Sequence, residues 1–143
     1  MAYVHKSTLS FRISGDSLVP AEITSLLGAE PTFSHSKGDE IRINQAGRLR
    51  IARTGMWLRS VDDRTPENLD GQLRKLFDEL SDDLSVWQRI DETYSADLFC
   101  GLFMKGSNEG LTISASVMKM IADRRLAIGF DIYGGERTPE TTG

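Results

Sequence analysis

The chain has 143 residues, a net charge of −4 and one cysteine, with 39% hydrophobic and 27% charged residues. That length is typical of one domain, and a chain of this size buries roughly 68–70% of its unfolded surface without needing disulfides. No apolar run approaches the roughly 18–20 residues that span a bilayer, and residues 1–6 lack the apolar core of a secretion signal. Together with the lone Cys100, these features predict a soluble cytoplasmic protein.

The charge is unevenly distributed along the chain. Residues 1–61 hold eight Lys and Arg against five Asp and Glu, a net of +3, whereas residues 62–97 hold four against eleven, a net of −7. Two opposite patches suit self-association or a charged partner, and a solvated surface is the plainer interpretation. The acidic total argues against nucleic-acid binding, for which a basic domain is the usual footprint.

The first third of the chain predicts a strand, a helix and a long loop. Residues 8–13 alternate between apolar and polar side chains, which predicts a half-buried strand. Pro20 suits the first turn of a helix, and Gly28 suits its left-handed stop. Residues 30–47 are then mostly loop, with a short strand over 41–43.

Residues 48–60 are predicted to form one long strand with a defect. Their apolar side chains fall on odd positions before Gly55 and on even positions after it. A period-two pattern that changes phase at a glycine indicates a β-bulge or a sharp bend. Within 49–60, three arginines and Trp57 project from this strand, so it is the first candidate for a contact surface.

The second half alternates helices and strands. Thr65-Pro66-Glu67 has the cap, first-turn proline and acid of a helix start. The other expected elements are a helix over 84–94 after Asp82-Asp83, a strand over 98–104 covered on both faces, a returning strand from 111, a helix capped by Ser114 or Ser116, and a closing strand over 126–133 with one buried face.

This order predicts an α+β fold, in which helices pack on a mixed or antiparallel sheet. A ferredoxin-like element is one form it could take, because split β-α-β units recur in such orders. We expect a single domain over 7–133 and a disordered tail over 134–143, which has almost no apolar content.

Several short stretches form an ordered set along the chain: 15–24, Leu27-Gly28, Pro31-Thr32, Lys37-Gly38, 54–57 and Phe130-Asp131-Ile132-Tyr133. This set resembles a bacterial family known only as domain of unknown function 4279, and the likeness runs from about residue 8 to 133. The family has no established activity, so the resemblance implies a small bacterial domain and supplies no catalytic residues.

Common catalytic and cofactor signatures are missing from the sequence. His5 and His35 are the only histidines, and Cys100 lies in an apolar run, so no metal site is expected. The pairs Asp62-Asp63 and Asp82-Asp83 are interpreted as helix caps, with calcium or magnesium binding as the alternative. No serine elbow and no phosphate-binding glycine fingerprint occurs, and no cofactor is predicted.

The best functional lead is a set of basic residues around one tryptophan. Guanidinium beside indole suits stacking and the capture of carboxylate or phosphate. The alternative is that Trp57 belongs to the core and the arginines are solvated or paired with acids. The predicted partner- or ligand-binding residues are Lys37, Arg50, Arg53, Trp57 and Arg59.

Three hypotheses follow for function. The first is a non-enzymatic module that binds a protein partner, or a second copy, through the loop over 30–47 and the strand over 48–60. The second is a domain that captures a small anion between Lys37, Arg53 and Trp57. The third is an enzyme without a recognisable motif, for which Asp16, Lys37 and Asp39 are the first candidate site residues. The sequence favours a non-enzymatic function over this third hypothesis.

Overall fold

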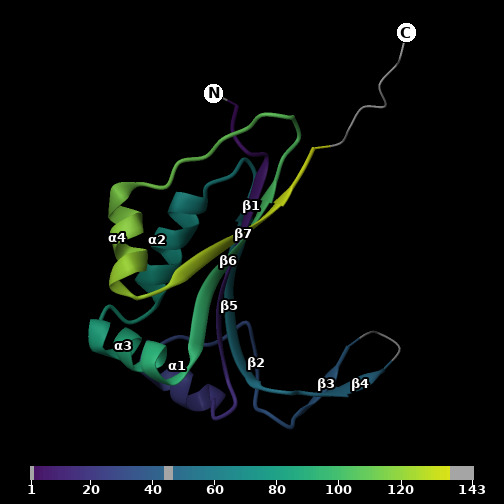
Figure 1. Ribbon diagram of the computed structural model, residues 1–143, viewed down its shortest axis with the longest axis vertical. Coiled ribbons are helices and arrows are strands. Elements are labelled where there is room, and N and C mark those ends of the chain that lie inside the picture. Colours follow the sequence, from purple (N-terminus) through teal and green to yellow (C-terminus); the bar gives the residue numbers. More distant parts are fainter. Residues whose placement is uncertain (1, 44–46, 136–143) are drawn as a thin grey trace.

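A computed structural model describes residues 2–43 and 47–135 of the chain (Figure 1). Most of the predicted tail, residues 136–143, lies outside the described residues. In chain order the elements are β1 (Lys6–Gly15), α1 (Pro20–Leu27), β2 (Phe33–His35), β3 (Glu40–Arg42), β4 (Leu49–Ile51), β5 (Gly55–Arg64), α2 (Leu69–Glu79), α3 (Leu84–Thr93), β6 (Ser95–Phe103), α4 (Ala115–Asp123) and β7 (Ala127–Tyr133).

The main sheet has five strands in the order β2-β5-β1-β6-β7. Strand β1 is antiparallel to both β5 and β6, and β6 is parallel to β7. Because β1 and β2 are each antiparallel to β5, which lies between them, β1-α1-β2 is a split β-α-β unit of the kind found in ferredoxin-like folds. The mixed sheet with helices packed on it confirms the predicted α+β class.

The helices lie together on one side of the main sheet (Figure 1). Alternation along β1 explains why: Leu9, Phe11 and Ile13 are at most 1% exposed and face the helices, while Ser10 and Arg12 face the other way. The predicted strand over 8–13 is therefore confirmed with its orientation. The side of the sheet that carries Ser10 and Arg12 is called the open face below.

The prediction of one long strand over 48–60 is wrong, although the bend that it placed at Gly55 coincides with the start of β5. Strand β4 belongs to a separate two-stranded sheet with β3, and β5 begins again at Gly55 in the main sheet. Between them Ala52 is buried, and its N–H and C=O bond to the C=O of Asp39 and the N–H of Gly38. A Cβ at Gly55 would lie only 2.8 Å from the Gly15 carbonyl oxygen, so this close approach needs glycine.

The predicted start of α2 at Thr65 is also wrong. Strand β5 continues to Arg64, so Asp62 and Asp63 are strand residues and not helix caps. The helix is capped instead by Asn68, whose side-chain oxygen accepts the N–H of Gly71 at 3.1 Å. By contrast, Asp83 caps α3 as predicted, and Ser114 caps α4.

A buried glutamine fixes the first turn of α2 against the sheet. Gln72 is 3% exposed; its amide nitrogen donates to the carbonyl oxygens of Ser7 and Asp62, at 3.1 and 2.9 Å. Its amide oxygen accepts the Ser7 hydroxyl at 2.6 Å. These bonds join α2 to β1 and β5, and they leave the buried polar atoms of Gln72 satisfied.

Strand β6 is central, but helices cover only one of its faces. Leu98 and Cys100 are buried on the helix side, whereas Phe99 and Phe103 lie on the open face. There the Arg12 guanidinium lies 4.7 Å from the Phe99 ring centroid, and the Lys6 ammonium 5.1 Å from that of Phe103. The rings are thus shielded by cations and their alkyl stems instead of a second layer.

Three further expectations need correction. Residues 33–35, expected as loop, form β2 at one edge of the sheet. No strand forms over 111–113; just before this segment, Gly110 makes an isolated bridge with Tyr3. Strand β7 is the opposite edge of the sheet, and the face expected to be buried is largely exposed: Phe130 and Ile132 are 45% and 60% exposed.

Replacing Asn68 by alanine should lower the free energy of unfolding by about 1 kcal/mol, because the N–H of Gly71 loses its acceptor. Thr65→Ala, at the cap predicted from sequence, should change it by less than about 0.5 kcal/mol. Urea unfolding followed by circular dichroism measures both values. Equal losses in the two variants would contradict the Asn68 cap.

Candidate functional site

The β3–β4 hairpin projects beyond the body of the domain, away from the helices (Figure 1). We call residues 40–43 and 47–51 the hairpin arm. Its register places Glu40 opposite Ile51, Ile41 opposite Arg50 and Arg42 opposite Leu49. Each face of this ribbon therefore combines aliphatic and charged side chains.

The aliphatic side chains of the arm are open to solvent. Ile43, Leu49 and Ile51 are 52%, 54% and 56% exposed. Leu49 and Ile51 share one face of β4, on which they are neighbours two positions apart. The arm thus presents an apolar pair flanked by Arg42 and Glu40, which is a composition suited to contact with another protein.

Three of the predicted site residues, all of them cations, lie on or near the arm. Arg50 is an exposed residue of β4, and Arg53 is exposed immediately after the buried Ala52. Lys37 lies before the arm, where its ammonium is 3.2 Å from the Asp16 carboxylate. These three cations sit at the base and along the side of the projecting segment.

The other two predicted site residues belong to the interior side of β5. Trp57 has no exposed surface, and its indole N–H donates to the Thr24 hydroxyl of α1 at 3.1 Å. Arg59 donates twice to one carboxylate oxygen of Glu79, at 2.7 and 3.3 Å, and once to the Glu30 carbonyl. Both side chains hold the helices to the sheet.

The burial of Trp57 bears directly on the predicted anion pocket. A ligand held between Lys37, Arg53 and Trp57 would need an accessible indole, and the structure places that ring in the core. These three side chains therefore do not line one open pocket. The alternative interpretation, in which Trp57 is a core residue, is confirmed by its burial.

The residues considered for an unrecognised enzyme form surface contacts. Asp16 pairs with Lys37, and Asp39 accepts the backbone N–H of Ser36 at 2.9 Å, closing a local turn. The Lys37 ammonium and the Thr54 hydroxyl hold the pKa of Asp16 below its usual value. The side chains of Lys37 and Asp16 are 55% and 69% exposed, so this is an ordinary solvated ion pair.

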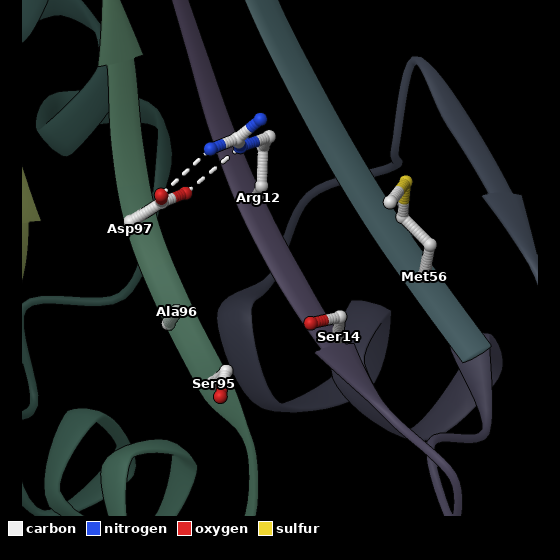
Figure 2. Close-up of a pocket in the computed structure, with 6 residues that line it drawn as sticks. All are labelled: Arg12, Ser14, Met56, Ser95, Ala96 and Asp97. Atoms are coloured by element: carbon white, nitrogen blue, oxygen red, sulfur yellow. Dashed lines mark hydrogen bonds and ion pairs between the residues drawn. The ribbon is translucent and has the colours of Figure 1, made fainter. Parts of the chain in front are cut away.

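A hollow of about 280 Å³ lies on the open face where β1, β5 and β6 meet (Figure 2). The Arg12 guanidinium makes two bonds to the Asp97 carboxylate, at 2.9 and 2.7 Å, and this pairing raises the pKa of Arg12. Ser14 and Ser95 contribute hydroxyls, and Met56 an apolar side. The hollow offers hydrogen bonds to a small polar molecule but no paired nucleophile and base.

Sequence reasoning did not find this hollow. Arg12 and Asp97 are 85 residues apart, and only the pairing of β1 with β6 brings them together. The available signal was the polar parity of β1, where Ser10, Arg12 and Ser14 share the face opposite the core. That signal locates the exposed side of a strand but does not name its partner.

Groups that could bind metal or act as nucleophiles are dispersed. Within residues 2–43 and 47–135, no three His, Cys, Asp or Glu side chains gather as a metal ion would require. Cys100 is buried, and burial raises the pKa of its thiol to about 12, so the reactive thiolate is scarce at neutral pH. None of the described helices is long and apolar enough to cross a membrane.

These features define a small α+β protein with a mixed sheet, one open sheet face and a projecting hairpin. Residues 5–135 match the family described as "Domain of unknown function (DUF4279)", so the chain belongs to that family, as its resemblance predicted. No curated protein and no solved structure matches the chain.

Arg59→Ala should lower the free energy of unfolding by about 1 kcal/mol, because a partly buried pair with Glu79 and a bond to Glu30 are lost. Arg53→Ala, on the solvent side, should change it by less than about 0.5 kcal/mol. Chemical unfolding of both variants, with Glu79→Ala to close a double-mutant cycle, gives the comparison. Equal effects at Arg53 and Arg59 would contradict these placements.

The Asp16 carboxylate should titrate in the folded protein below the value of about 3.9 found in model peptides. A depressed folded pKa means that the pair favours folding above the unfolded pKa, and that this contribution is lost as pH falls through the folded pKa. Carbon-detected NMR titration of the side chain measures the shift. Lys37→Ala should raise the Asp16 pKa, and an unchanged titration would contradict the ion pair.

Proposed function

We propose that this protein is a non-catalytic interaction module that binds a protein partner through residues 30–60, with the hairpin arm as the principal contact. The observation that supports it most is the exposure of Ile43, Leu49 and Ile51 on a projecting two-stranded ribbon. The buried single cysteine favours a reducing compartment such as the cytoplasm.

A two-stranded ribbon without a packed layer is marginally stable in water. The arm is held at its base by the backbone bonds of Ala52 with Gly38 and Asp39, and no layer of the described structure covers its faces. Covering the exposed halves of Leu49 and Ile51 would contribute about 1 kcal/mol for each side chain. A partner would thus gain binding energy and order the ribbon.

The charges of the arm favour an acidic partner surface. Arg42 and Arg50 lie on the arm, Arg53 follows it, and the two acids nearby are Asp39 and Glu40. Arginine is enriched in protein interfaces, and a local excess of positive charge accelerates encounter with an acidic surface. Arg59 has no part in this proposal because Glu79 and Glu30 already engage it.

Capture of the tagged protein from lysate of its own host, with quantitative mass spectrometry, tests the proposal. The double variant Arg50→Glu/Arg53→Glu should reduce recovery of a stoichiometric partner at least about tenfold, since both reversals oppose an acidic surface. Leu49→Ser/Ile51→Ser, which keeps the charge, should do the same through lost apolar contact.

The matched control is Lys75→Glu/Arg89→Glu, which reverses two exposed cations on α2 and α3. It changes the net charge by the same amount and should leave recovery unchanged. Equal recovery with the arm variants and the control would overturn the arm as the contact surface. Purification of the wild-type protein without any partner would count against the module itself.

A further inference from the structure

Strand β7 ends the main sheet and carries few of the features that protect an edge strand. Its outer side pairs with no other strand of the described structure. It contains neither lysine nor proline, and its register with β6 has no bulge. Asp131 is the one charged residue of this strand. Natural sheets usually protect such edges with charges, prolines or bulges, so an unprotected edge invites another strand.

The backbone groups that face this edge can be identified. The Tyr133 carbonyl accepts the Met104 N–H at 3.0 Å, so the backbone of Tyr133 faces β6. Residues of one parity in a strand point their N–H and C=O the same way, and the register along β7 is regular. The backbone groups of Ile128, Phe130 and Ile132 therefore face outward.

The side chains of the same three residues form an apolar row. They pair with Leu98, Cys100 and Leu102 of β6 and so lie on the helix side of the sheet. Ile128 is partly buried, but Phe130 and Ile132 are 45% and 60% exposed. Both the unpaired backbone groups and the exposed apolar side chains of β7 thus belong to one set of residues.

We propose that a second copy of this chain pairs with β7 in antiparallel orientation, with Phe130 on the two-fold axis. This register sets Phe130 against Phe130 of the second copy and Ile128 against its Ile132. The outward-facing residues are then the ones that exchange N–H···O=C bonds, as antiparallel pairing requires. The result is one continuous sheet through both copies with an unbroken apolar row on its helix side.

The residues of the other parity fit this register as well. Asp131 then lies opposite Gly129 of the second copy, so the carboxylate faces a residue without a side chain. In the isolated chain nothing demands glycine at 129: a Cβ there would meet only the Leu98 carbonyl oxygen, at 4.0 Å. Pairing across the two-fold axis supplies a reason for that glycine.

The pattern favours a second copy over an unrelated protein. Apolar residues at 128, 130 and 132 are symmetric about Phe130, so the strand is complementary to itself when it is reversed. An isologous contact of this kind needs no matching surface elsewhere. The proposal concerns β7 alone and does not depend on the hairpin arm.

Sedimentation equilibrium of the full chain over a concentration series tests the proposal. We expect a species of twice the 15.9 kDa chain mass. Phe130→Lys and Phe130→Glu should each raise the dimer dissociation constant at least about tenfold, because like charges then meet at the axis and an aromatic pair is lost. An equimolar mixture of the two variants should recover the dimer, since opposite charges then face each other.

Leu84→Lys is the matched control, because it replaces a 47% exposed apolar residue on α3, away from β7. It should leave the dissociation constant unchanged, and circular dichroism should show every variant folded. A monomer at all concentrations overturns the proposal, as does a dimer that Phe130→Lys leaves intact. Loss of the dimer in Arg50→Glu/Arg53→Glu alone would assign self-association to the arm instead.

Discussion

The contact on which the structure depends most is a cluster of aromatic rings centred on Phe11. Its ring centroid lies 6.0 Å from that of Trp57 on β5 and 5.3 Å from that of Trp87 on α3. Trp87 in turn meets Phe77 of α2 edge-on at 6.1 Å, and the Trp57 indole reaches Thr24 of α1. One cluster thus joins the central strands to three helices, and it lies wholly on one face of the sheet.

That one-sided core has consequences for the rest of the surface. With the helices on one face, the aromatic rings of the open face must be shielded locally, and the alkyl stems and charges of Lys6 and Arg12 do this. Two parts of the sheets expose large apolar side chains: the hairpin arm, which projects from the domain, and the edge strand β7. The arm is a two-stranded ribbon that no layer of the described structure covers, and the outer side of β7 pairs with no strand of the described structure. Both are therefore the candidate surfaces for contact with another protein chain.

Elements with local signals could be predicted from the sequence. Helix α1 has its proline and its glycine stop, and α3 and α4 have their caps at Asp83 and Ser114. The change of phase at Gly55 predicted a bulge or a bend, but not that the chain changes sheets there, because that depends on the close approach of Gly55 to Gly15 and Leu18. The hollow on the open face likewise needs the pairing of β1 with β6, which spacing along the chain does not reveal.

The candidate site was only partly predictable, and β5 shows why. Arg53 and Arg59 are the same residue type, six positions apart, yet Arg53 is exposed and Arg59 bonds to Glu79 and Glu30. The difference arises because the chain changes sheets between them, which resets the side on which each side chain projects. Trp57, with the parity of Arg59, enters the core. A basic residue beside a tryptophan is therefore a binding signal only where the local strand parity leaves both side chains in solvent.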